Sequence, residues 1–107
     1  MQSRIKILWD YYEQNPNDPF NLYALALEYL KLEQKTEAIL FLERLLTEHP
    51  TYVPTYYQLG KIYEQNSEDQ KKAVEVYEQG ILHCKTQGNL KTEQELRNAL
   101  DELMFDY

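Results

Sequence analysis

The chain has 107 residues and a formal net charge of −7, with ten tyrosines, three glycines and one cysteine. This length fits one domain, spanning residues 1–107, and leaves no room for a second. The single Cys84 excludes an internal disulfide and a multi-cysteine zinc site. So few glycines and prolines argue against an all-β domain, which needs many turns.

The acidic charge bears on the expected partners and location of the protein. The pI is about 4.8, and acidic residues outnumber basic ones by 8 to 5 in residues 1–52 and by 10 to 6 in residues 53–107. Without a basic stripe, binding to nucleic acid or to an anionic membrane surface is not expected. Basic or neutral protein segments are favoured as partners instead. No secretion signal and no long apolar run is visible in the sequence, so a cytoplasmic protein is expected.

The apolar spacing predicts helices along nearly the whole chain. A leading helix is expected within residues 2–16, ahead of a helix that has Asp18 as its N-cap and Pro19 as its first residue. The next helix is expected to begin at an N-cap Thr36 and to end by His49, because Pro50 disfavours helix at the residue before it. The buried sides of these two helices are predicted to be Leu22, Leu25, Ala26 and Tyr29, followed by Ala38, Leu42, Leu45 and Leu46.

Three further helices are expected in the second half of the chain. The first begins near Pro54, and a capping-box pattern at Ser67 predicts the start of the second, which Gly88 ends. The third opens near Asn89 or Thr92. The predicted buried sides are Tyr56, Leu59, Gly60 and Tyr63, then Ala73, Tyr77, Gly80 and Ile81, then Leu96, Ala99, Leu100, Leu103 and Met104.

The two halves of the chain repeat each other. Leu22 and Tyr56 are 34 residues apart, while Ala38 and Ala73 are 35 apart, which places one inserted residue in the turn at 64–70. The other pairs at a distance of 34 are Leu25 with Leu59, Ala26 with Gly60, Tyr29 with Tyr63, and Pro16 with Pro50. Six matched pairs in the same order indicate a helical repeat.

This pattern resembles the tetratricopeptide repeat of small bacterial-type proteins: a large residue, Leu-Gly or Leu-Ala, Tyr, a later Ala and a closing Pro. Residues 19–52 match as a first repeat and residues 53–87 as a second. Residues 2–16 resemble only the second half of a repeat, and residues 89–105 the capping helix that such arrays usually carry. The resemblance implies an all-α fold, a right-handed α-α superhelix of antiparallel helix pairs with about two and a half repeats plus a C-terminal capping helix.

No catalytic constellation emerges from the sequence. The two serines lie outside any nucleophile-elbow pattern, the three glycines are too far apart for a phosphate loop, and no His-Glu-x-x-His motif occurs. His83 is expected to face solvent, and Cys84 to be structural. The protein is therefore expected not to be an enzyme and to need no cofactor and no metal.

What remains is a surface for protein–protein interaction. The resemblance places two sets of residues on the inner, concave side of the superhelix, where a partner peptide or protein segment binds. They are Tyr23, Leu27, Leu30 and Lys31 in the first repeat, and Tyr57, Gln58, Lys61 and Glu64 in the second. Tyrosine suits such contacts because it offers a large rigid area with a polar tip. The implied function is that of a small adaptor.

Two alternatives stay open at this point. In one, the protein is a self-associating structural protein, a homo-oligomer whose concave face is closed by another copy or by its own terminal helix. In the other, the tail Phe105–Tyr107 docks into the groove of another copy, instead of fraying or packing at the end of the last helix.

Overall fold

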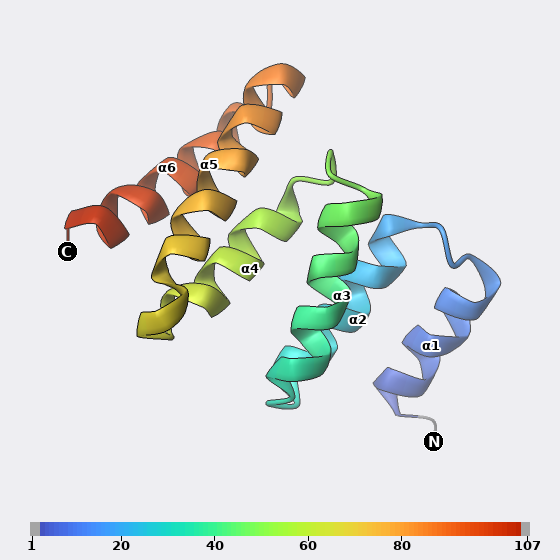
Figure 1. Ribbon diagram of the computed structural model, residues 1–107. Helices are drawn as coiled ribbons and strands as arrows, with labels where there is room; N and C mark the ends of the chain where they lie inside the picture. The colour runs from blue at the N-terminus through green and yellow to red at the C-terminus, as the bar shows by residue number, and fades with distance from the viewer. Residues whose placement is uncertain (1–2, 106–107) are drawn as a thin grey trace. The chain divides into compact units, whose positions relative to one another are not determined.

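The computed structural model describes residues 3–105, and this range is helical throughout apart from short connections (Figure 1). The all-α fold class is confirmed. No helix in the described range is long and apolar enough to cross a membrane. The elements are α1 (Arg4–Gln14), α2 (Pro19–Lys31), α3 (Lys35–Glu48), α4 (Pro54–Glu64), the 3₁₀ turn η1 (Ser67–Asp69), α5 (Gln70–Gln87) and α6 (Leu90–Phe105).

The helices form two compact units, Met1–Tyr52 and Val53–Tyr107, which are described separately. Unit 1 holds α1, α2 and α3, and unit 2 holds α4, η1, α5 and α6. The boundary between the units coincides with the boundary between the two repeats in the sequence. Each unit is therefore one helical hairpin with one additional helix.

In unit 1, α2 packs against both α3 and α1. The predicted stripe of α2 is confirmed, since Leu22, Leu25 and Ala26 are completely buried, while Tyr29 is half-buried. On α3, the three residues Ala38, Leu42 and Leu45 are completely buried as well, and Leu46 is half-buried. The apolar spacing thus identifies the faces that the two helices of the hairpin turn toward each other.

Aromatic side chains attach α1 to this hairpin. The Trp9 indole Nε1 donates a hydrogen bond of 3.0 Å to the Tyr29 hydroxyl, and the Trp9 ring packs edge-on against Phe41 with ring centroids 5.7 Å apart. The Arg44 Nη1 donates to the Tyr12 hydroxyl over 2.6 Å. The leading helix is therefore held by aromatic packing and by side-chain hydrogen bonds, in addition to the buried Leu8.

In unit 2, α4 and α6 both pack against α5, and α4 also contacts α6. The predicted buried stripes of α4 and α5 are confirmed. The two helical glycines lie where side chains of a neighbouring helix approach the backbone. A Cβ at Gly60 would collide with the ring of Tyr77, and a Cβ at Gly80 would lie 2.6 Å from the Tyr56 Cβ and 2.8 Å from the Leu96 Cδ1.

Several predicted helix ends are confirmed. The Asp18 carboxylate accepts from the Phe20 amide over 2.9 Å, and the Asn89 side chain accepts from the Thr92 amide over 3.2 Å. Gly88 ends α5 in the left-handed conformation, with φ +70°. His49 is the C-cap of α3, and α4 begins at Pro54.

Two predicted caps are wrong. α3 begins at Lys35, so Thr36 lies inside the helix. The reason is the end of α2, where Glu33 has φ +61° and the Gln34 amide bonds to the Tyr29 carbonyl over 2.8 Å. This αL closure leaves no free residue for a separate cap before α3.

Ser67 does not cap α5, because it is the first residue of η1 and α5 begins only at Gln70. The capping side chain is that of Asn66, whose Oδ1 accepts from the Glu68 amide over 3.0 Å. A short amide side chain reaches the backbone two residues ahead, and this local bond starts the 3₁₀ turn instead of a helix.

The predicted environments of Met104 and His83 are also corrected. Leu96 and Ala99 are buried in α6 and Leu100 and Leu103 are half-buried, but Met104 is 53% exposed. At 100° per residue, position 104 has turned to the edge of the stripe that Leu96 defines.

His83 is half-buried and stacks on the Tyr56 ring, with centroids 5.6 Å apart. Of the predicted tail, Asp106 and Tyr107 lie outside the described residues, as does Gln2 in the leading segment.

The close packing at Gly80 leads to a test of unit 2. We expect Gly80→Leu to lower the free energy of unfolding by about 3 kcal/mol, because the new side chain collides with Tyr56 and Leu96 in a packed core. Gln79→Leu, at the exposed neighbouring position of α5, should change it by less than about 0.5 kcal/mol. Urea unfolding followed by circular dichroism measures both. An unchanged midpoint for Gly80→Leu would contradict the packing described here.

Candidate protein-interaction site

The inner-face residues predicted in the first repeat gather around one pocket in unit 1. Tyr23, Leu27 and Lys31 of α2 all line it, whereas the half-buried Leu30 is not part of the lining. The pocket has a volume of about 500 Å³. Its remaining lining residues are Arg4, Phe20, Ala24 and Glu28. Together these seven residues are called the unit 1 pocket below.

Two aromatic side chains, Phe20 and Tyr23, line the unit 1 pocket. Phe20 is 61% exposed, and Leu27 is exposed as well. Tyr23 is half-buried and packs edge-on against Tyr52, with ring centroids 5.5 Å apart. Burial raises the pKa of the Tyr52 hydroxyl, with a smaller contribution from Tyr23. Tyr52 thus supports the Tyr23 ring from behind, which is a role that the sequence left open.

The charge around the unit 1 pocket differs from that of the whole chain. The Arg4 Nε lies 3.2 Å from the Glu28 Oε2, and the Glu28 side chain is only 11% exposed while that of Arg4 is 67% exposed. Lys31, one turn along α2 from Glu28, is exposed. Two positive charges and one paired, largely covered negative charge therefore surround the pocket, although the chain as a whole carries −7.

Sequence reasoning did not identify Arg4, Phe20 and Glu28. Arg4 belongs to α1 and reaches the pocket across a separation of 24 residues, which no periodicity reveals. Phe20 and Glu28 lie on α2 itself. Phe20 is three positions before Tyr23, and Glu28 is three positions before Lys31. Residues at this spacing share a helix face, so a helical-wheel analysis could have found both.

In unit 2, two of the residues predicted for the inner face of the second repeat lie beside α6. Tyr57 and Lys61 line a pocket of about 160 Å³ together with Glu95, Asn98, Ala99 and Glu102 of α6. The Lys61 ammonium lies 5.5 Å from the centroid of the Tyr57 ring and 3.2 Å from the Glu64 Oε1. Gln58 is half-buried and is not part of this lining. The cation on this face is therefore already matched by aromatic and acidic neighbours.

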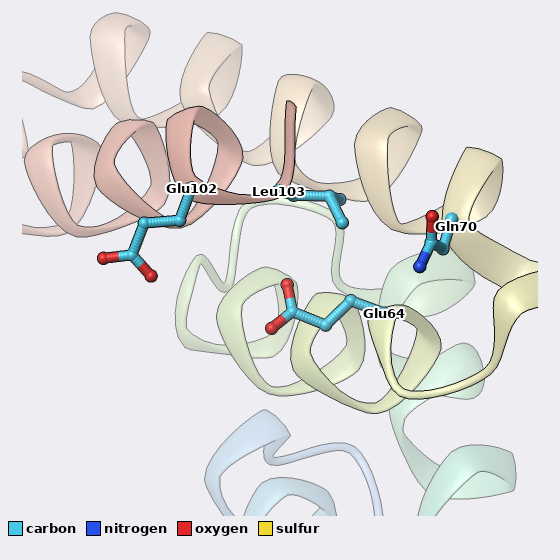
Figure 2. A pocket seen from close by; sticks show the side chains of 4 residues that line it. All are labelled: Glu64, Gln70, Glu102 and Leu103. Carbon is cyan, nitrogen blue, oxygen red and sulfur yellow. The ribbon is translucent and has the colours of Figure 1, made fainter. Parts of the chain in front are cut away.

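Glu64 lies in a neighbouring pocket of about 210 Å³, with Gln70, Glu102 and Leu103. Figure 2 shows Glu64 on α4 facing this space, with Glu102 and Leu103 on α6 and Gln70 on α5 around it. The Tyr77 hydroxyl donates to the Glu64 Oε2 over 2.9 Å. Burial, and then this hydrogen bond, raise the pKa of the Tyr77 hydroxyl far above its usual value. Glu64 is thus fixed by Tyr77 and Lys61, which makes it part of the framework of unit 2.

Reactive groups in the described range are few. No group of three His, Cys, Asp or Glu side chains among residues 3–105 is placed to hold a metal ion. Cys84 is buried, and burial raises the pKa of its thiol, which disfavours the nucleophilic thiolate. The expected structural role of Cys84 agrees with this environment.

Comparison with known proteins agrees with the repeat geometry. The family model of the tetratricopeptide repeat matches residues 21–52 and 53–82. The chain belongs to the tetratricopeptide repeat family. The two matched segments correspond to the α2–α3 and α4–α5 hairpins, so the resemblance to the tetratricopeptide repeat is confirmed. A search of curated proteins gives no match.

Solved structures of bacterial proteins share the fold. A crystal structure of a tetratricopeptide repeat domain protein from Salinibacter ruber is 39% identical, with a TM-score of 0.77, covering 81% of this chain and 96% of its own. A solution structure from the same organism is also 39% identical, with a TM-score of 0.77 and coverages of 83% and 89%. A solution structure of a protein from Bordetella parapertussis is 25% identical, with a TM-score of 0.80 and coverages of 99% and 91%. Tetratricopeptide repeats are generally protein-interaction modules and are typically not catalytic.

The Tyr77–Glu64 pair predicts a pH dependence of stability. The pKa of Tyr77 is raised in the folded state, so the folded protein keeps a proton that an unfolded tyrosine loses near pH 10. The contribution of the Tyr77 hydroxyl to the free energy of unfolding is therefore complete below about pH 10 and is lost as the pH rises further. We expect Tyr77→Phe to be less stable than the wild type by about 1–2 kcal/mol at pH 8. This difference should shrink above about pH 10, by up to about 1.4 kcal/mol per pH unit.

Urea unfolding between about pH 8 and pH 11 measures this difference. Tyr11→Phe is the matched control, because Tyr11 is exposed on α1 and its substitution should leave the stability profile of the wild type unchanged. A constant gap between the wild type and Tyr77→Phe over the whole pH range would contradict the assignment.

Proposed function

We propose that this protein is a small adaptor that binds a segment of a partner protein on the inner faces of its repeats, with the unit 1 pocket as the principal contact site. One observation carries the proposal: Phe20, Tyr23 and Leu27 expose apolar surface around an open pocket that Arg4 and Lys31 border. Such a pocket, apolar at its centre with charge at its rim, has the anatomy of a protein-binding site.

The energetics favour this site over other exposed apolar residues. An isolated exposed leucine is normal on a protein surface, whereas a continuous apolar patch usually marks a site of interaction. Tyr23 is held by Tyr52, so it loses little freedom when a partner binds. Arginine and tyrosine are also enriched among the residues that dominate binding energy. The unit 1 pocket combines both residue types.

The second-repeat residues belong to the proposal in a lesser role. Lys61 and Glu64 already pair with each other, and α6 lines the same pocket as Tyr57 and Lys61. A partner would have to compete with these internal contacts before it gained new ones. Tyr57 and Gln58 therefore remain candidates for added contacts at the edge of a partner segment, as Leu30 does in the first repeat.

The local charge refines the chemistry of the partner. The overall charge of −7 favours basic or neutral partners at long range. At the unit 1 pocket itself, Arg4 and Lys31 favour a segment that carries a carboxylate beside a bulky apolar residue. The function is that of an adaptor without catalysis of its own, and the cytoplasmic location expected from the sequence is part of the proposal.

A pair of leucine substitutions tests the site. In affinity capture from an extract of the source organism, Leu27→Glu should lose the partners that the wild type retains, because a carboxylate then occupies the apolar centre of the pocket. Leu40→Glu is the matched control, because Leu40 is exposed on α3 and does not line the pocket. Circular dichroism confirms folding of both variants. Equal recovery of partners by wild type and Leu27→Glu would refute the proposal.

A further inference from the structure

The unit 1 pocket is one of two exposed apolar surfaces that carry opposite charges. The other lies at the end of α6, where Asp101, Met104 and Phe105 follow the spacing i, i+3 and i+4, which places them on one face of the helix. Phe105 is 89% exposed, Met104 is 53% exposed, and Asp101 is exposed as well. These three residues are called the terminal patch.

The terminal patch has no structural explanation within unit 2. α6 packs through Leu96 and Ala99, which are buried, while Met104 and Phe105 have turned away from that contact. Exposing a phenylalanine and a methionine side by side forgoes the stabilisation that burial of each side chain would provide. Asp106 follows directly in the sequence and adds a second carboxylate to the segment.

We propose that the terminal patch of one copy of this chain docks into the unit 1 pocket of a second copy. The inference rests on the proposed function, since it names an occupant for the same pocket. Phe105 and Met104 supply the apolar contact to Phe20 and Leu27, and Asp101 supplies the carboxylate for Lys31. The pocket volume of about 500 Å³ lies within the range of about 300–1,000 Å³ that is usual for ligand sites.

Charge selects this pocket over the two unit 2 pockets described above. Those are lined by the carboxylates of Glu64, Glu95 and Glu102, of which Glu102 lines both. An acidic segment would be repelled there, because like charges brought together at an interface are unfavourable. The unit 1 pocket is lined by Arg4, Lys31 and Glu28, so its charges sum to +1, whereas Lys61 offsets only one of the carboxylates in unit 2. The charge of the unit 1 pocket is therefore the complementary one for the terminal patch.

The two surfaces differ, so the contact is head-to-tail. A heterologous contact of this kind builds rings if the rotation between copies closes and open chains if it does not. A patch of one helical turn buries little area, so the association is weak and depends on salt. A partner protein with a stronger segment of the same chemistry would displace the second copy, which makes self-association a reversible cover of the binding pocket.

Sedimentation velocity over a range of concentrations tests the proposal. The wild type should self-associate as the concentration rises toward the millimolar range, and Phe105→Ala should weaken this association at least about tenfold because it removes the apolar anchor. Leu90→Ala is the matched control, because Leu90 is 76% exposed at the opposite end of α6 and its loss should change nothing. A wild type that stays monomeric throughout would overturn the proposal.

A charge exchange tests the orientation of the contact. Lys31→Glu and Asp101→Lys should each weaken self-association about two- to fivefold, and the double variant Lys31→Glu/Asp101→Lys should restore it. Two weak single variants without recovery in the double variant would overturn the pairing. A change in shape that does not depend on concentration would show that the patch occupies the pocket of its own chain, and would likewise overturn the docking of a second copy.

The same variants separate this inference from the proposed function. If partner capture depends on Leu27 while self-association is absent or insensitive to Phe105, the docking of a second copy is wrong and the adaptor proposal stands. If self-association depends on both Phe105 and Leu27 while partner capture does not depend on Leu27, the pocket serves the second copy and the adaptor proposal is wrong.

Discussion

A single helical hairpin cannot cover its own apolar faces, and this constraint determines the composition of both units. The α2–α3 hairpin buries Leu22, Leu25 and Leu42 between its helices, but one side of α2 still needs a neighbour. α1 supplies that neighbour in unit 1, and α6 supplies it for the hairpin of unit 2. Each repeat is therefore completed by a helix from outside it, as the short-range packing of repeat proteins requires.

The choice of the third helix explains why the two repeats offer different surfaces. α1 is attached mainly through Trp9, Tyr12 and the contacts of Arg44, and it adds only Arg4 to the inner side of α2. α6 contacts α4 directly, and its residues line the same pocket as Tyr57 and Lys61. The same repeat register thus produces a pocket of about 500 Å³ with exposed apolar residues in unit 1, and a smaller pocket walled partly by carboxylates of α6 in unit 2. Register alone does not determine which inner face is available.

Much of this fold can be predicted from the sequence, because it depends on periodic and short-range signals. The 34-residue spacing identifies both hairpins, and the buried stripes follow from helix geometry. The functions of Gly60, Gly80 and Gly88 follow from their positions, since two permit close approach and one adopts a positive φ. Asp18 with Pro19, and Asn89 before α6, act as the caps that their residue types predict.

The errors arise where several residues compete for one local role. Thr36 and Ser67 are good N-cap residues, but the αL closure at Glu33 and the Asn66 side chain determine those turns. The register predicts Tyr23, Leu27 and Lys31 on one face of α2, and all three line the unit 1 pocket, while the binding of a partner at this face stays a prediction. Arg4 is brought to the pocket by tertiary packing, and His83 is covered because Tyr56 lies beside it. Neither effect leaves a periodic signal in one sequence.

Net charge is an average, and the structure divides it into surfaces of opposite sign. The carboxylates of Glu64, Glu95 and Glu102 gather around the pockets of unit 2, while Arg4 and Lys31 border the pocket of unit 1. An incoming molecule is steered by the total charge at long range but meets the local charge at contact, since screening limits each charge to about 8–10 Å. An acidic partner is therefore weakly repelled by the net negative charge of the chain as it approaches. It gains the attraction of Arg4 and Lys31 only once it is in contact with the unit 1 pocket. This combination favours short segments with one or two carboxylates over strongly acidic ones. The long-range repulsion grows with every added charge, while the pocket offers only Lys31 and Arg4, and Arg4 already pairs with Glu28.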